Sequence, residues 1–170
     1  MNKPKKLYFF GYGSLLSHKS LEDTIKNKKF KQVIVKGYKR VFNLSLSKRY
    51  NEDALNLVKS KGSKCNGVIF KISEDELIRL NSRELEYNIE SVTVYDAKTG
   101  KKIGTALTSI DFLIKIDKKK KFPGKGYFNM CRNAAYKIGK SFGRIWDETT
   151  FMSNGESVGD FLKRNPKFAK

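Results

Sequence analysis

The chain has 170 residues, of which 39% are hydrophobic and 31% are charged. This length and composition are typical of one globular domain with a substantial core, so the sequence predicts a single domain over residues 1–170 and excludes a fully disordered chain. No segment approaches the roughly 20 apolar residues of a membrane-spanning helix, and the apolar run near the N-terminus is too short for a signal peptide. We therefore expect a cytoplasmic protein that has no membrane partner.

The charge is strongly positive, with 36 Lys and Arg residues against 17 Asp and Glu residues and a formal net charge of +19. Such a charge attracts nucleic acid non-specifically at low salt. Arg is the residue best suited to specific recognition of phosphates and bases, but only seven of the basic residues are Arg. The Lys residues are spread along the whole chain. The densest run, Lys118–Lys121, is most simply a solvated loop. Polyanion (RNA) binding through this charge remains an alternative function.

Cysteine and histidine are scarce. Cys65 and Cys131 lie far apart without CxxC spacing, and His18 is the single histidine, so neither a disulfide framework nor a zinc site is expected. A Ser-His-Asp or Cys-His site would need His18, which is expected on an exposed first helical turn. The sequence therefore predicts no metal and no cofactor, and it argues against hydrolysis by a nucleophilic side chain.

The chain begins with a pattern of strand, tight loop and helix. Residues 7–12 are aromatic and aliphatic, as in a buried strand, and a glycine-containing turn follows. Ser17 or Ser20 can cap the next helix. A second helix is predicted to start at Ser73, because Glu76 three residues later completes a capping box.

The remaining elements are mostly strands, with helices in the last third. Segments rich in β-branched and aromatic residues predict strands at 31–46, 56–59, 66–72, 89–95 and 103–110, with turns at 61–64 and 99–100. Apolar residues at helical spacing predict helices over 127–142 and around 158–162. The expected fold is therefore α+β, a mixed sheet of five to seven strands curled into a barrel with flanking helices.

The first candidate site is the loop of Tyr12, Gly13, Ser14 and Leu15. Glycines between a buried strand and a helix allow a sharp bend and leave N–H groups that can receive a carboxylate or phosphate. The spacing matches neither a Walker loop nor a dinucleotide-binding fingerprint. A tight turn that serves packing alone is an equally good interpretation of this loop.

The second candidate is the acidic pair Glu84 and Glu86, where a helix ends and a strand begins. A carboxylate at such a junction can point into an aromatic cavity, where desolvation raises its pKa and makes it a usable proton shuttle. A solvated ion pair with Arg83 is the alternative.

The third candidate is Tyr127, at the start of the helix that carries Cys131. Its hydroxyl can point into a pocket, although packing is the commoner role of such a residue. Cys131 is interpreted as a small buried apolar residue.

Taken in this order, the segments resemble the γ-glutamylcyclotransferase superfamily, including its AIG2-like members. The resemblance rests on residues 8–15 (YFFGYGSL), 37–42 (GYKRVF), 66–70 (NGVIF), 80–84 (LNSRE) and 123–142, which carry a Pro, a Tyr and a Cys-containing helix. It covers residues 7 to about 165 and implies the γ-glutamylcyclotransferase-like fold. It also implies that a small γ-glutamyl amide is converted to 5-oxoproline with release of an amine.

The resemblance assigns roles to particular residues. Tyr12, Gly13, Ser14 and Leu15 would hold the γ-glutamyl moiety, with backbone N–H groups on its α-carboxylate or on the developing oxyanion. Glu84 would be the acid/base, and Tyr87 and Tyr127 would contact substrate. The segment after Glu84 lacks a glycine that is common in the family, so Glu86 is an alternative acid/base. Glutathione-specific members typically carry the sequence REKxGY. Residues 83–87 of this chain (RELEY) keep only its Arg-Glu pair and its Tyr, which argues against glutathione specificity.

The implied chemistry suits this sequence. The substrate's own α-amine attacks its γ-carbonyl, so one carboxylate is sufficient and no Ser, Cys or His nucleophile is required. Two alternatives stay open besides polyanion binding: a non-catalytic small-ligand binder on the same fold, and release of γ-glutamyl groups from larger amines. The sequence carries no signal of oligomeric state.

Overall fold

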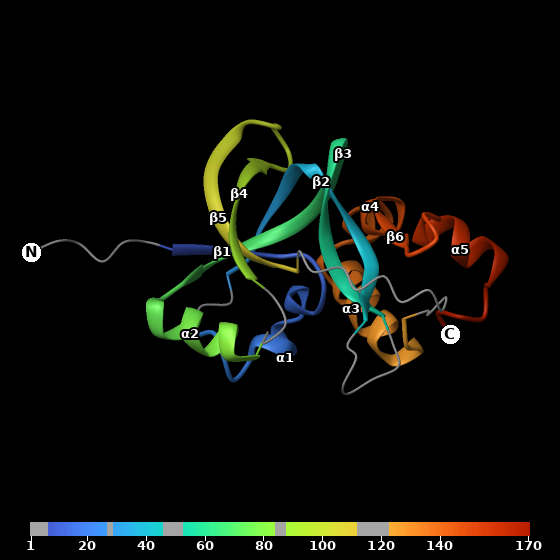
Figure 1. The fold of residues 1–170 in the computed structure, drawn as a ribbon, viewed down its shortest axis with the longest axis horizontal. Helices are drawn as coiled ribbons and strands as arrows, with labels where there is room; N and C mark the ends of the chain where they lie inside the picture. The colour runs from blue at the N-terminus through green and yellow to red at the C-terminus, as the bar shows by residue number, and fades with distance from the viewer. Residues whose placement is uncertain (1–6, 27–28, 46–52, 84–87, 112–122) are drawn as a thin grey trace, which may run out of the picture.

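The computed structural model describes residues 7–26, 29–45, 53–83, 88–111 and 123–170. The strands are β1 (Leu7–Gly11), β2 (Lys31–Ser45), β3 (Asp53–Ile72), β4 (Asn88–Asp96), β5 (Lys102–Ile110) and β6 (Thr150–Met152). The helices are the short 3₁₀ helix η1 (Ser14–Leu16), α1 (His18–Leu21), α2 (Glu74–Arg83), α3 (Lys125–Ile138), α4 (Lys140–Thr149) and α5 (Val158–Arg164). Figure 1 shows α2 at the left of the view, α1 below the strands, and α3 to α5 at the right.

The sheet closes on itself as a ring. Its strand order is β3-β1-β5-β4-β2-β6, and an additional pairing of β2 with β3 joins the two ends of the five longer strands. The pairs β1–β5 and β2–β6 are parallel and the others are antiparallel. The predicted α+β fold, with a mixed and strongly curled sheet and flanking helices, is therefore confirmed, and six strands fall within the expected range.

The longest pairing of the ring contains an irregularity that the sequence suggested was a turn. β2 and β3 pair from Lys31 opposite Ile69 to Ser45 opposite Asp53, with a register shift next to Gly37. Gly37 and Gly62 both have positive φ, 81° and 80°, which glycine adopts without steric cost. The predicted turn at 61–64 is therefore wrong: residues 60–63 form an enlarged bulge opposite Gly37 within one continuous strand, and Lys64 pairs with Lys36.

Helix α2 begins as its capping box predicts. The amide of Glu76 donates to Ser73 Oγ at 3.2 Å, and the amide of Ser73 donates to Glu76 Oε2 at 2.8 Å. Glu76 Oε1 also accepts a hydrogen bond from the amide of Lys26 at 2.8 Å. One carboxylate therefore both caps α2 and anchors the segment that follows α1.

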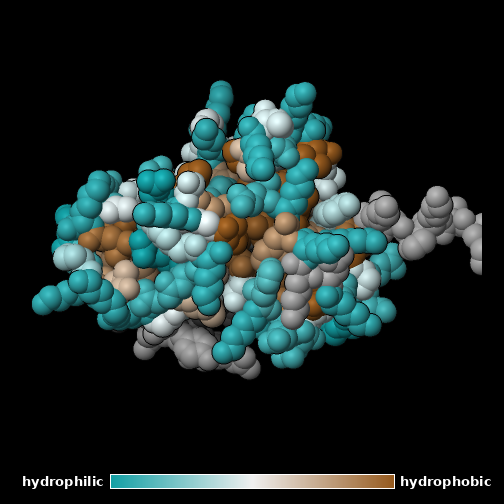
Figure 2. All heavy atoms as spheres, turned by 180° about the vertical axis from the view of Figure 1, so that it is seen from behind, coloured by the Kyte–Doolittle hydropathy of each residue, from teal (hydrophilic) through white to brown (hydrophobic). Residues whose placement is uncertain are grey.

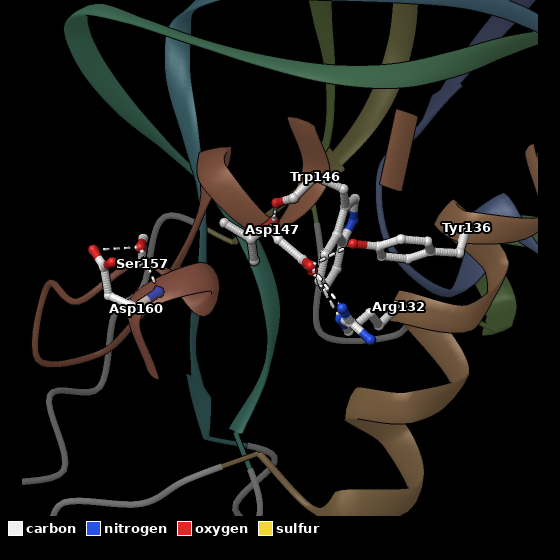
Figure 3. A network of polar contacts seen from close by, with 7 residues as sticks. Arg132, Tyr136, Trp146, Asp147, Ser157 and Asp160 are labelled. Atoms are coloured by element: carbon white, nitrogen blue, oxygen red, sulfur yellow. Dashed lines mark hydrogen bonds and ion pairs between the residues drawn. The ribbon is translucent and has the colours of Figure 1, made fainter. Parts of the chain in front are cut away.

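The predicted helix over 127–142 is two helices, which meet at Gly139. Arg132 on α3 forms a two-point ion pair with Asp147 on α4, with Nη2 at 2.8 Å from Oδ2, and Tyr136 donates to the same oxygen at 2.8 Å (Figure 3). A Cβ on Gly143 would lie 2.5 Å from the Tyr136 ring. The chain reverses here because the two helices pack closely and share this polar network.

The core fills the ring and the space between the ring and α3 and α4. Phe42 lies at its centre, with ring contacts to Phe128 and Trp146 at centroid distances of 5.7 and 6.3 Å. Cys65 and Cys131 are buried and neither forms a disulfide, which confirms the burial predicted for Cys131. Burial raises the pKa of the Cys65 thiol, so this thiol is poorly suited to act as a nucleophile.

The surface is largely hydrophilic, in keeping with the many charged residues of the sequence. Figure 2 shows long hydrophilic side chains over most of the rear face, with small hydrophobic areas exposed between them. None of the helices in the described ranges has the length and apolar composition to span a membrane. His18 is exposed, as expected, with its ring edge against Phe30.

Candidate active site

Two of the three candidate sites, the glycine loop and Tyr127, meet at one small cavity. Its volume is about 30 Å³, and its walls are Tyr12, Gly13, Ser14, Leu15, Leu55, Ser109 and Tyr127. These residues come from the loop after β1, from β3, from β5 and from the start of α3. The folded chain therefore places Tyr127 beside the glycine loop, as the resemblance implies.

Two larger hollows lie elsewhere on the described surface. One, of about 660 Å³, lies among α1, the start of β2 and α3, and the other, of about 560 Å³, lies over β1, β3 and β5. Neither is lined by the residues predicted to bind substrate. We place the candidate site at the smaller cavity because it unites those residues from distant parts of the chain.

The side chain of Tyr12 ties the loop to β5. Its hydroxyl donates a buried hydrogen bond to the carbonyl of Ser109 at 2.7 Å. Its ring stacks on Phe10 with centroids 6.1 Å apart. The aromatic ring and the hydroxyl thus fix the direction in which the chain leaves β1.

The backbone carbonyl of Tyr12 is held from the opposite side. It accepts hydrogen bonds from Arg40 Nη1 and from Trp146 Nε1, each at 3.2 Å. These two donors come from β2 and α4. Together they orient the peptide group that joins Tyr12 to Gly13.

Arg40 is a fully buried cation. Its Nε donates to Thr150, Nη1 to the carbonyls of Tyr12 and Asn66, and Nη2 to the side chains of Asn66 and Thr149. Burial lowers the pKa of Arg40 to about 10, so the guanidinium stays charged at neutral pH. These five acceptors match the five N–H donors of a guanidinium, which explains how the charge is accommodated inside the protein.

Sequence reasoning assigned no role to Arg40 or Trp146. A signal for Arg40 was present, because it lies two residues before the buried Phe42 on the same strand, and alternate strand residues share a face. A charged residue in phase with a core position indicates a buried polar network. The contact of Trp146 carried no comparable signal, since it depends on how α4 packs.

The turn after Tyr12 passes close to β3, with little space for a side chain. A Cβ on Gly13 would lie 3.1 Å from Leu55 Cδ1. Gly13 also begins the 3₁₀ turn, because its carbonyl accepts from the amide of Leu16 at 3.0 Å. The first amides of such a turn have no acceptor inside the helix. The predicted sharp loop is confirmed, and residues 13–15 line the cavity.

Tyr127 closes the cavity from α3. Its hydroxyl accepts a hydrogen bond from the amide of Leu55 at 3.3 Å, and its ring packs edge-on against Phe42. The side chain is half-buried. The phenol oxygen is therefore held at the cavity wall, where it can also contact a bound molecule.

The end of β5 is held as firmly as the loop. The Asn56 side chain exchanges two hydrogen bonds with the backbone of Asp111, at 2.9 and 3.0 Å. Ser109, two residues earlier, lines the cavity. Sequence reasoning did not single out Ser109, because a serine in a β-rich segment carries no distinguishing pattern.

The predicted acid/base lies outside the described residues. The same is true of its alternative Glu86, of Tyr87 and of the lysine run 118–121. On either side of Glu84, α2 ends at Arg83 and β4 begins at Asn88, which pairs with Ile110 beside Ser109. The chain thus enters β4 next to the cavity wall. Among the described residues, no three His, Cys, Asp or Glu side chains form a group suited to a metal ion.

Comparison with known families decides the affiliation of the chain. The sequence model of a family described as "ChaC-like protein" matches residues 7–154. The chain belongs to this family. The match spans the glycine loop, the ring of strands and most of the helical segment that carries Tyr127. A search among curated proteins finds no significant match.

Solved structures show the same fold for this ChaC-like chain. A structure named "Gamma-glutamyl cyclotransferase" is 17% identical with a TM-score of 0.67, and the match covers 94% of this chain and 99% of that one. The uncharacterized protein loc79017 from Homo sapiens is 18% identical with a TM-score of 0.68, covering 93% and 98%. A yeast γ-glutamyl cyclotransferase described as specific to glutathione is 15% identical with a TM-score of 0.56, covering 96% of each chain. At these identities the likeness establishes the fold.

Proposed function

We propose that this ChaC-like protein is a γ-glutamylcyclotransferase. It cyclises the γ-glutamyl group of a small γ-glutamyl amide to 5-oxoproline and releases the free amine or amino acid. The observation that carries the proposal is the shared cavity, because Tyr12, Gly13, Ser14, Leu15 and Tyr127 all line it. The family match and the fold of the γ-glutamyl cyclotransferase structures support the same reaction class.

The reaction places few demands on the protein. The α-amine of the substrate attacks the γ-carbonyl of the same molecule, a C–N bond forms, and the bond to the departing amine breaks. The α-ammonium loses one proton before attack and a second as the lactam N–H forms, while the departing amine gains one proton as its C–N bond breaks and a second on becoming an ammonium ion. A single carboxylate can carry these protons one at a time between the two nitrogens, and in our proposal Glu84 does so.

The loop supplies the polar environment. The amides of residues 13–15 suit either the α-carboxylate or the oxyanion that develops on the γ-carbonyl. The Tyr12–Gly13 peptide is already oriented by Arg40 and Trp146, so little reorganisation is needed when charge develops. The buried charge of Arg40 is hydrogen-bonded to this peptide and favours a negative group near the loop.

The acid/base assignment supports a direct comparison of two neighbouring residues. Glu84 keeps the spacing from Leu80 found in the family motif, and Glu86 lies two residues closer to β4. In our proposal Glu84→Gln abolishes 5-oxoproline release, because the amide cannot accept the proton of the α-ammonium. Glu86→Gln, the matched control, retains most of the activity.

The experiment measures 5-oxoproline released from γ-glutamyl amino acids, γ-glutamyl amines and glutathione by the wild type and both variants. Turnover that only Glu84→Gln removes supports the proposal, and the preferred substrate identifies the leaving amine. Loss with Glu86→Gln alone would move the acid/base to that residue. Absence of turnover with the whole panel would contradict the proposal and favour a binding protein on this fold.

A further inference from the structure

Ser109 carries an unusual hydroxyl. The residue is only 4% exposed and lines the candidate cavity. Its Oγ is buried and has no hydrogen-bond partner within the described part of the chain. Burying a hydroxyl without a partner costs free energy, so natural proteins rarely retain one without a reason.

The preceding residue on β5 provides a contrast. Thr108 is also fully buried, and its hydroxyl donates to the carbonyl of Phe10 at 3.0 Å. The backbone of Ser109 is used as well, since its carbonyl accepts from the Tyr12 hydroxyl. Of these groups, the Ser109 hydroxyl alone has no partner among the described residues, and Ser109 lines the cavity.

The position of Ser109 is tightly fixed. On one side Tyr12 binds its carbonyl, and on the other Asn56 binds the backbone of Asp111. In β4, Ile89 lies directly opposite in the antiparallel ladder. The backbone that carries the Ser109 hydroxyl is therefore fixed before a partner enters the cavity.

The cavity is small, with a volume of about 30 Å³, so a polar group that enters it lies close to the residues of its wall. The apolar side chains of Leu15 and Leu55 form part of its wall and offer a polar group no hydrogen bond. Such a group must therefore bind to the loop, to Tyr127 or to Ser109.

We propose that Ser109 Oγ hydrogen-bonds to the γ-glutamyl head of the substrate and helps to determine specificity for it. This inference rests on the proposed function. The head is favoured over the leaving amine because Ser109 shares the cavity with residues 12–15 and is hydrogen-bonded to Tyr12. The contact involves the part of the substrate that becomes 5-oxoproline.

Ser109→Ala tests this contact, because a substrate role and a structural role predict opposite effects. Without ligand, the variant unfolds at the same temperature as the wild type or at a higher one, since a buried hydroxyl without a partner is removed. With substrate, kcat/KM falls about 3- to 10-fold, the usual range for one hydrogen bond. We expect the same fall in kcat/KM for every leaving amine. 5-Oxoproline should also inhibit the variant more weakly than the wild type, by a similar factor.

Thr108→Val is the matched control. It also removes a buried hydroxyl from β5, but one that is paired with Phe10. It lowers the unfolding temperature and leaves kcat/KM within about twofold of the wild type, because nothing in the cavity is changed.

Several results would overturn the inference. Unchanged kinetics in Ser109→Ala would mean that the hydroxyl binds at most a water. A lower unfolding temperature of Ser109→Ala would assign the hydroxyl a structural role. A loss of kcat/KM that varies with the leaving amine would place the contact outside the γ-glutamyl head. If the wild type itself releases no 5-oxoproline, the proposed function fails and this inference fails with it. An active wild type with an equally active Ser109→Ala rejects the role of Ser109 alone.

Discussion

Arg40 Nη1 lies 3.2 Å from the carbonyl oxygen of Tyr12, which links a buried cation on β2 to the first residue of the loop that we propose binds substrate. The same guanidinium binds both the carbonyl and the side chain of Asn66 on β3 and two threonines at the end of α4 and the start of β6. One side chain thus connects the loop to the ring of strands and to the helical layer.

We predict that Arg40→Lys lowers the free energy of unfolding by roughly 2–4 kcal/mol and strongly reduces 5-oxoproline release. Lysine keeps the charge but cannot reproduce the planar five-donor geometry, so several buried acceptors lose their partners. Urea unfolding at neutral pH measures the change in stability. Arg144→Lys, at an exposed position on α4, is the control and is expected to change stability by less than about 0.5 kcal/mol. Equal stability of the two variants would contradict the structural role of Arg40.

We predict that Gly13→Ala reduces activity at least about tenfold while the protein remains folded. The added Cβ meets Leu55 Cδ1 at 3.1 Å, a side-chain atom that can shift slightly, but the shift changes the cavity wall and the direction of the loop amides. The measurement is kcat/KM together with the thermal unfolding midpoint.

Gly126→Ala is the matched control for the loop glycine. Gly126 lies in the first turn of α3, and no atom lies within 4 Å of its added Cβ. Alanine is the better helix former by about 0.5–1 kcal/mol, so this variant is expected to be slightly more stable. Full activity in Gly13→Ala would show that the close approach to Leu55 does not shape the site.

Glu76 makes the stability of the protein depend on pH. Burial acts to raise its pKa, but hydrogen bonds from the amides of Lys26 and Ser73 outweigh burial and hold the pKa of Glu76 below the ordinary value of 4.5. The folded pKa is lower than the unfolded one, so the carboxylate stabilises the protein above about pH 4.5. That contribution is lost as the pH falls through the folded pKa.

We predict that Glu76→Gln destabilises the protein by about 1 kcal/mol at pH 7 and reduces the loss of stability below pH 4.5. Unfolding free energies measured from pH 7 to pH 3 check the prediction. Glu74→Gln, on the exposed side of the first turn of α2, serves as the control. If both variants show the wild-type pH profile, the Glu76 carboxylate is not a source of the acid sensitivity.

Local sequence patterns determined several features without tertiary information. The Ser73–Glu76 capping box marked the start of α2, and the Thr99–Gly100 turn marked the hairpin of β4 and β5, where Gly100 has a φ of 68°. These features succeed because the atoms involved lie within a few residues of each other. The glycine loop at 11–13 was recognisable for the same reason.

Other features were invisible or misread. The 61–64 segment looks like a turn because its Lys-Gly-Ser-Lys composition suits one, but pairing with β2 keeps it within a strand. The helix over 127–142 ends early because α4 folds back to pair Asp147 with Arg132 and Tyr136. In both cases partners distant in sequence overrode a local preference.

For the candidate site, the sequence alone determined the residue types: a glycine loop, a late tyrosine, and an acidic pair whose placement remains a prediction. Only the tertiary structure decided that Tyr12, Ser109 and Tyr127 surround one cavity and that Arg40 and Trp146 hold the loop from behind. The reason is physical. Hydrogen bonds and packing between residues that lie about a hundred positions apart depend on closure of the strand ring, and no local pattern encodes that closure.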